Sequence, residues 1–218
     1  MTVKPKLKRR ELILATALKL FNKQGSHKVT TNHIAKAMGI SPGNLYYYFK
    51  NKEHIIRELL TRLIKGFDSL VRIPGKTKSG LDLIAETIAA TSELIYSYRF
   101  IYIELAALLA RDEIFKAMYH DIKDRRAKEF VLAFAFLAQM GVFRQGITAE
   151  ERDAVIFIMW TYAEGIITAL HTSNIQVTPA TIQTHFKKIV YIFKTYLQPE
   201  QWSALAQKLD LSEKALTY

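Results

Sequence analysis

The segment TTNHIAKAMGISPGNLYYYFKNKEHIIREL, residues 30–59, decides the fold of this chain. With Thr31 as position one of a helix-turn-helix, the fifth position must be small because the second helix crosses there, and it is Ala35. The ninth must adopt a left-handed turn, and it is Gly39. The positions that lock the two helices together are all apolar: Ile34, Met38, Ile40 and Leu45. The spacing therefore predicts a helix-turn-helix.

The flanking residues extend this unit in both directions. A first helix is predicted over about 8–24, with Leu12, Ile13, Ala17, Leu20 and Phe21 on one face, and Gly25 ends it. Thr30 caps a helix that ends near residue 38, and Ser41 caps a third that has proline at its first position. Asn51 caps a fourth helix, which runs to about residue 71.

The net positive charge of the chain comes entirely from its first third. Residues 1–66 hold 14 Lys and Arg against three acids, whereas residues 67–218 hold 17 of each sign. This segregation is typical of a head that binds a polyanion, because phosphate contacts by Lys and Arg release counterions. A merely solvated basic surface and a membrane-surface head remain alternatives on charge alone.

With these residues in view, the segment resembles the DNA-binding domain of the TetR family of bacterial transcriptional regulators. The resemblance covers roughly residues 8–60, and its most specific part is the run LYYYFKNKE at residues 45–53. His33 departs from the family pattern, which often has an acidic residue there, and we expect a weaker cap interaction for the second helix. In the rest of the chain the resemblance is only architectural.

The resemblance implies that the short third helix enters the major groove of DNA with its N-terminal residues. The residues expected to bind DNA are Thr30, Thr31, Ser41, Gly43, Asn44, Tyr46, Tyr47, Lys50 and Lys52. Thr30 and Ser41 would serve as caps even without DNA, and Tyr46 fits a half-buried position equally well. Tyr48 and Phe49 are expected in the core rather than on DNA. The basic residues 4–10 are either an arm that reaches an adjacent groove or a solvated tail.

The remainder of the chain reads as all-α, with no run that alternates with period two. Helices are predicted at about 81–98, 100–111, 113–140, 148–172, 180–197 and 199–209. The segment IPGKTKSG at residues 73–80 is the clearest break. We therefore predict a helix-turn-helix domain over 1–66 and a larger helical bundle over 67–218.

Aromatic residues are unusually frequent over residues 81–172. The resemblance implies that these helices enclose a pocket for a small-molecule inducer, and the residues expected to line it are Phe100, Glu104, Phe134, Trp160, Glu164 and His171. An aromatic stripe at helical spacing is more often ordinary core. The inducer is unknown, and neither a cofactor nor a metal is expected.

The helices at about 148–172 and 180–197 are apolar on more than one face, so each must be covered. The resemblance implies that the same pair from a second copy covers them, although buried core helices fit the pattern equally well. A two-fold dimer implies a palindromic operator with half-sites roughly 34–36 Å apart. The expected function is a repressor that an inducer releases from this operator. The alternative is a non-specific or architectural DNA-binding protein.

Other classes of protein are disfavoured. The chain has no cysteine, which excludes disulfides and thiolate chemistry and is compatible with the cytoplasm. Its six histidines are scattered, and neither a HExxH metal motif nor a glycine-rich phosphate loop is present, so no enzyme is expected. No signal peptide is recognised, and the apolar stretches are too short or too interrupted to span a membrane.

Overall fold

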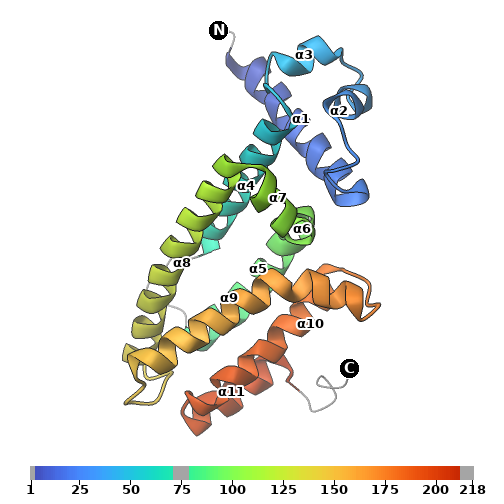
Figure 1. Ribbon diagram of the computed structural model, residues 1–218. Helices are drawn as coiled ribbons and strands as arrows, with labels where there is room; N and C mark the ends of the chain where they lie inside the picture. The colour runs from blue at the N-terminus through green and yellow to red at the C-terminus, as the bar shows by residue number, and fades with distance from the viewer. Residues whose placement is uncertain (1–2, 71–78, 212–218) are drawn as a thin grey trace. The chain divides into compact units, whose positions relative to one another are not determined.

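The computed structural model describes residues 3–70 and 79–211. Helices account for nearly all of the regular structure there, and no strand is present in those two stretches (Figure 1). The elements are α1 (Val3–Gln24), α2 (Thr31–Ala37), α3 (Pro42–Tyr46), α4 (Lys52–Leu70), α5 (Gly80–Ser97), α6 (Arg99–Ile103), α7 (Leu105–Arg111), α8 (Glu113–Gln139), α9 (Ala149–Thr172), α10 (Pro179–Ile189), the 3-10 helix η1 (Val190–Thr195) and α11 (Pro199–Leu209). The all-α prediction is confirmed. Most of the predicted break at 73–80 lies outside the described residues.

The chain divides into two compact units, each described here by itself. The first contains residues 1–66 and 97–120, and the second contains residues 67–96 and 121–218. The predicted boundary after residue 66 coincides with one of these divisions. The segment 97–120, which the sequence assigned to the larger domain, instead joins the head.

The first unit is built on α1. Its buried face carries Ile13, Leu14, Ala17 and Phe21, each no more than 1% exposed. Leu12, which the sequence placed on this face, is 51% exposed. Gly25 ends the helix with φ +81°, and its N–H donates to the carbonyl of Phe21 at 2.9 Å. The predicted left-handed stop is therefore present.

Contacts of Ser97 and of α6 tie the segment 97–120 to this unit. The buried ring of Phe100 lies 5.1 Å from that of Phe21. The side chain of Asn22 donates to the carbonyl of Ser97 at 2.7 Å and accepts from the N–H of Phe100 at 3.1 Å. The single helix predicted over 100–111 is broken at Glu104, whose φ of −105° and ψ of 11° are not helical.

A buried carboxylate ties α4 to the start of α8 in the same unit. Asp112 is 8% exposed and accepts from Arg57 at 2.8 Å. Its other oxygen accepts from the N–H groups of Ile114 and Phe115, each at 3.0 Å, which caps α8. Asp112 thus does the work of a helix cap, as its predicted place at a helix start suggested.

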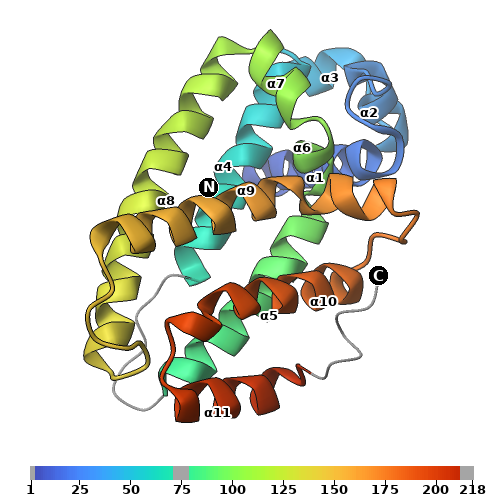
Figure 2. The ribbon, with the colours of Figure 1, turned by 60° about the horizontal axis from the view of Figure 1, so that its bottom comes forward.

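The second unit holds α5, most of α8, α9, α10, η1 and α11, and α5 and α10 lie side by side (Figure 2). The ring of Phe134 stacks on that of Phe143 at 4.3 Å, and Phe193 lies 6.1 Å from Phe143. An isolated bridge joins Phe143 to Leu197. The helix predicted over 180–197 is shorter, because the chain continues from Val190 as a 3-10 helix.

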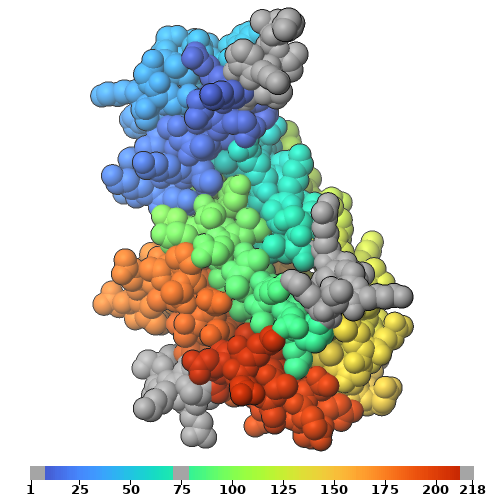
Figure 3. All heavy atoms as spheres, turned by 180° about the vertical axis from the view of Figure 1, so that it is seen from behind, coloured from blue at the N-terminus to red at the C-terminus, as the bar shows by residue number. Residues whose placement is uncertain are grey.

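The start of α5 is fixed by close contacts. A Cβ on Gly80 would lie 2.7 Å from Cγ2 of Val142, so only glycine fits there without a shift. Ser79 caps the helix, since its hydroxyl accepts from the N–H of Asp82. The Asp82 carboxylate forms an ion pair with Lys208 of α11, which lies against this end of α5 (Figure 3). The side-chain hydrogen bonds from Lys208 and Ser79 lower the pKa of Asp82 to about 2.

Helix α9 carries apolar residues on opposite sides. Val155 and Ile156 are buried, whereas Phe157 is 67% and Ile158 43% exposed. Among the described residues, this is the one helix long and apolar enough to span a membrane by length and composition, which the sequence analysis did not predict. A core or interface helix of a soluble protein meets the same criterion, so the feature is weak support for a membrane.

Candidate nucleic-acid interface

The turn between α2 and α3 has the packing that the sequence predicted. Ala35 is 1% exposed, and Ile34 and Leu45 are fully buried. Gly39 has φ +64°, and the N–H of Ile40 donates to the carbonyl of Ala35 at 3.0 Å. A side chain larger than alanine at position 35 would therefore displace the second helix, and a residue other than glycine at position 39 would be strained.

Both helices of the motif are capped by hydroxyl side chains. Thr30 accepts from the N–H of His33, and Nδ1 of His33 accepts from the N–H of Thr30, each at 3.3 Å. This reciprocal pair is a capping box in which an imidazole nitrogen takes the place of the usual side-chain oxygen. The cap is therefore formed with His33 in this position, and its expected weakness stays a prediction. Ser41 accepts from the N–H of Asn44 at 3.2 Å, and Pro42 occupies the first position of α3.

The outer face of α3 is exposed above this buried layer. Gly43 and Asn44 are exposed, Tyr46 is 50% exposed, and Tyr47 is 67% exposed. A Cβ on Gly43 would meet no atom within 4 Å, so the fold itself does not require glycine there. The hydroxyls of Tyr46 and Thr31 lie 3.0 Å apart. The structure thus gathers five of the nine predicted DNA-binding residues on one face.

The junction between α3 and α4 separates core from surface as expected. Phe49 is fully buried, Tyr48 is half-buried, and the guanidinium of Arg10 lies 4.9 Å from the Phe49 ring centroid. Arg10 also pairs with Glu58 at 2.7 Å. The basic residues 4–10 therefore belong to α1, which begins at Val3, and Arg10 contacts the core. They do not form a free arm.

Lys50 is exposed, and its backbone N–H donates to Nδ1 of His54 at 3.4 Å. The N–H of His54 donates in turn to the Asn51 side chain at 2.8 Å, which confirms the predicted cap of α4. Burial lowers the pKa of His54, and nearby Arg10, Arg57 and Lys50 act in the same direction against the opposing charge of Glu58. The imidazole is therefore neutral at pH 7 and can accept from Lys50.

Lys52 has a structural contact that the sequence did not reveal. Its Nζ donates to the carbonyl of Ser26 at 2.7 Å. Ser26 lies in the turn between α1 and α2 and is fully buried. No motif marks this serine, because its partners are far away in the sequence.

Four residues proposed from the sequence to line an inducer pocket lie in the second unit. Phe134 is 9% exposed and stacks on Phe143. Trp160 donates through Nε1 to Glu164 at 2.5 Å, and Glu164 also pairs with Lys123 at 3.6 Å. His171 is exposed. Within this set, Trp160 and Glu164 are in direct contact.

The other two pocket candidates, Phe100 and Glu104, lie in the first unit. Phe100 packs on Phe21, and Glu104 accepts from the N–H of Ser26 at 2.6 Å and from its hydroxyl at 2.5 Å. Both side chains are therefore occupied by contacts with the head.

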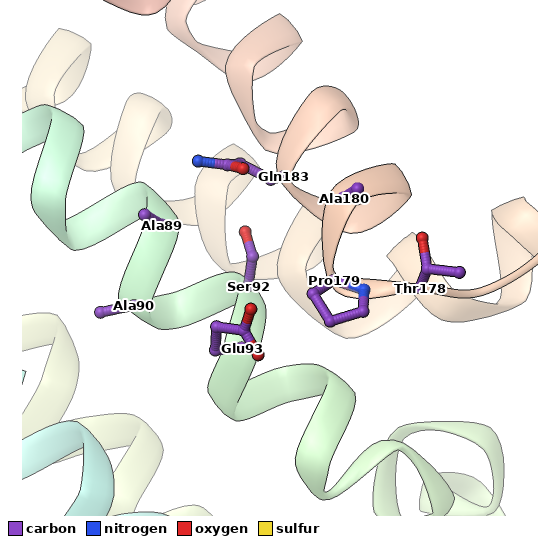
Figure 4. Close-up of a pocket in the computed structure, with 8 residues that line it drawn as sticks. All are labelled: Ala89, Ala90, Ser92, Glu93, Thr178, Pro179, Ala180 and Gln183. Carbon is purple, nitrogen blue, oxygen red and sulfur yellow. The ribbon is translucent and has the colours of Figure 1, made fainter.

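A different part of the second unit is hollowed. A pocket of about 480 Å³ lies between α5 and the start of α10 (Figure 4). The residues that line it are Ala89, Ala90, Ser92, Glu93, Thr178, Pro179, Ala180 and Gln183. The three alanines and Pro179 supply apolar surface, and Glu93 supplies the one charged group of the lining. None of the six residues expected from the sequence lines this pocket.

In the part of the chain that the structure describes, no three His, Asp or Glu side chains come close enough to hold a metal ion. The exposed face of α3, with Gly43, Asn44 and Tyr46 and with Tyr47 directly after the helix, is the clearest candidate site.

Both the head and the body of the chain are similar to known bacterial regulators. Residues 13–59 match the family model described as bacterial regulatory proteins of the tetR family, and residues 62–205 match that of a bacterial transcriptional repressor, TetR. The nucleoid occlusion factor SlmA of Haemophilus ducreyi is 28% identical over 190 residues, which cover 83% of this chain and 88% of SlmA. The HTH-type transcriptional regulator QacR of Staphylococcus aureus is 26% identical over 170 residues, 76% of this chain and 88% of QacR.

The solved structures agree with the family models. A TetR-family transcriptional regulator from Marinobacter aquaeolei superposes with a TM-score of 0.84 at 29% identity, over 93% of this chain and 97% of that protein. The family model for the body alone spans more than half of the sequence. With its capped helix-turn-helix and its helical body, this chain belongs to the TetR family of bacterial transcriptional regulators.

Proposed function

We propose that the chain is a repressor that binds a palindromic operator as a homodimer and is released from it by a small-molecule inducer. TetR-family regulators bind DNA and small-molecule ligands and act as dimers. The observation that carries the proposal is the face of α3, where Gly43, Asn44, Tyr46 and Tyr47 are exposed above a buried helix-turn-helix core. The protein would act in the cytoplasm, where its DNA is.

Each element of this face suits DNA. The open space beside Gly43 leaves room for the sugar-phosphate backbone to approach. The amide of Asn44 is suited to a base edge or a phosphate, and a tyrosine ring is suited to a thymine methyl, with its hydroxyl on a phosphate. The exposed ammonium of Lys50 would contact the backbone. Residues on the first turn of a short helix are those that enter the major groove.

The dimer would form through the exposed side of α9. Ala154, Ile158, Thr161, Gly165 and Thr168 recur there at helical spacing, and all are exposed. The side chains are small or apolar, and a Cβ on Gly165 would meet nothing within 4 Å. A second copy of the helix can therefore approach closely, and α10 would complete a four-helix interface with two-fold symmetry.

Footprinting tests the operator geometry. Hydroxyl-radical cleavage of a bound duplex should show two protected patches related by two-fold symmetry, about one helical turn apart. Protection of a single patch, or uniform weak protection along the whole duplex, would contradict the dimeric operator.

The inducer would bind in the pocket between α5 and α10. Its volume of about 480 Å³ lies within the range of roughly 300–1,000 Å³ that is usual for small ligands. The N-terminus of α10 is closed by Thr178 and Thr181, whose hydroxyls accept from its free N–H groups, so it offers little to an anion. Among the described residues no basic side chain pairs with Glu93. We therefore propose a ligand with an apolar body and a positive charge.

Thermal shift with alkylammonium ions, and with neutral alcohols of equal size as controls, tests this pocket. The ammonium ions should raise the melting temperature and weaken operator binding, because only a ligand that prefers the released state shifts the equilibrium. Glu93→Gln should remove the preference for cations, and Ala180→Trp should remove binding of both classes. Binding that survives Ala180→Trp would place the inducer elsewhere.

A second candidate function is DNA binding without control of a promoter. The similarity to proteins named nucleoid occlusion factors favours keeping it. A reporter gene downstream of the bound sequence separates the two. With the bound sequence at its native distance from the promoter, a regulator should change transcription of the reporter by more than about tenfold. A protein that binds DNA without control of a promoter should leave transcription of the same reporter unaltered.

A further inference from the structure

Ser26 is the centre of a buried polar cluster in the first unit. The residue is fully buried in the turn between α1 and α2. Its N–H and its hydroxyl both donate to the carboxylate of Glu104, at 2.6 and 2.5 Å, through different oxygens. A carboxylate that accepts from both the N–H and the hydroxyl of one residue holds that residue in one conformation.

Glu104 occupies an unusual place in the helices. It is the residue at which α6 ends and α7 begins, and its side chain is only 10% exposed. Arg111 lies 3.7 Å from it and donates to the Ser26 hydroxyl at 2.8 Å, and Nδ1 of His27 lies 3.5 Å away. The break in the helix thus brings a buried carboxylate under the turn of the head.

The cluster continues to a residue expected on DNA. The carbonyl of Ser26 accepts from Nζ of Lys52 at 2.7 Å. A lysine ammonium has three donors, so this contact uses one and leaves two for phosphate oxygens. The hydrogen bonds therefore form a continuous chain from Glu104 through Ser26 to Lys52.

We infer that Glu104 is a positioning residue for DNA binding: by holding Ser26 in place, it fixes the carbonyl that anchors the ammonium of Lys52 where it can contact a phosphate. The inference rests on the proposed function only in requiring that Lys52 contacts DNA. Replacing the Glu104 carboxylate by an amide leaves Ser26 one acceptor oxygen in place of two. Ser26 and its carbonyl are then held less firmly, and the Lys52 side chain loses its fixed anchor. A long lysine side chain then has to be ordered on DNA at an entropic cost.

A double-mutant cycle with Glu104→Gln and Lys52→Gln tests this inference. The probe is a labelled duplex that the wild-type protein binds, specific or not, because a phosphate contact contributes to both kinds of complex. Glu104→Gln should weaken binding about fivefold in the wild type and cause no further loss once Lys52 is replaced. It should also lower the slope of log affinity against log salt by about one, as Lys52→Gln does. Equal losses in both backgrounds, or no loss in either, would overturn the inference.

Two further variants keep the result clear. Glu113→Gln makes the same charge change on a side chain that is 81% exposed, and it should alter neither affinity nor salt slope. If Glu104→Gln melts below the assay temperature, Ser26→Ala takes its place in the cycle, because this substitution removes only the hydroxyl. We expect a smaller loss of DNA affinity, which should again disappear once Lys52 is replaced. If Lys50→Gln weakens binding and the cycle shows no coupling, the DNA interface stands and the role of Glu104 falls.

Discussion

The hydroxyls of Thr31 and Tyr46 lie 3.0 Å apart, and this contact joins the first turn of α2 to the last residue of α3. Thr31 is half-buried and Tyr46 is 50% exposed, so both reach the surface on the face proposed to bind DNA. The hydrogen bond orients two side chains that sequence analysis assigned to DNA separately.

Tyr46→Phe should therefore weaken operator binding while the fold remains intact. The substitution removes one exposed hydrogen bond, and we expect a three- to tenfold loss of affinity, about 0.5–1.5 kcal/mol. Fluorescence anisotropy measures it. In a Thr31→Val background the same change should cost less, since the partner is already absent. Unchanged affinity in Tyr46→Phe would exclude the Tyr46 hydroxyl from the interface.

Tyr47 and Phe49 should show opposite effects when replaced by alanine. Tyr47 is 67% exposed, so Tyr47→Ala should cost about tenfold in operator affinity and less than about 0.5 kcal/mol in the free energy of unfolding. Phe49 is fully buried, and Phe49→Ala should cost about 3–5 kcal/mol in the same free energy. Urea denaturation and anisotropy on both variants give the comparison; a large loss of stability in Tyr47→Ala would place its ring in the core.

Gly165→Leu should abolish the dimer and leave the protomer folded. The added side chain enters open space in the protomer, where leucine is also the better helix former, but it would obstruct the approach of a second α9. Sedimentation velocity should show a dimer for the wild type and a monomer for the variant. Ala127→Leu, on an exposed position of α8, is the matched control and should stay dimeric. A dimeric Gly165→Leu would exclude this face.

His54 should make the stability depend on pH. Because burial lowers its pKa in the folded state, the unfolded chain takes up the proton first as the pH falls. The stabilisation is complete above about pH 6.5 and declines as the pH falls towards the lower folded pKa. The difference in unfolding free energy between the wild type and His54→Gln, measured by urea denaturation from pH 5 to 8 in about half-unit steps, should decrease on acidification. A difference that is constant or grows would contradict a lowered pKa.

Local patterns in the sequence predicted most of the fold. The helix-turn-helix, its caps and its glycine turn depend on residues within a few positions of one another, and Ala35, Gly39 and Leu45 lie as expected. The end of the first helix, marked by Gly25, was also predicted closely.

Features that depend on distant residues were not predicted. Glu104 breaks a helix without any glycine or proline, since its carboxylate binds Ser26, which is 78 positions away. Leu12 lies at the edge of the apolar stripe of α1, where periodicity alone does not separate buried from exposed. The pocket between α5 and α10 is lined mainly by small residues and by no aromatic one. The richness in aromatic residues, on which the predicted pocket was based, therefore pointed to other positions.

The most direct test of the account is anisotropy with labelled duplexes from the DNA that flanks this gene, against scrambled duplexes, across a salt series. The account predicts that one flanking fragment binds about a thousandfold more tightly than scrambled DNA at equal salt, and that Lys50→Gln weakens both. Equal and steeply salt-dependent binding to every duplex tested would contradict a sequence-specific repressor.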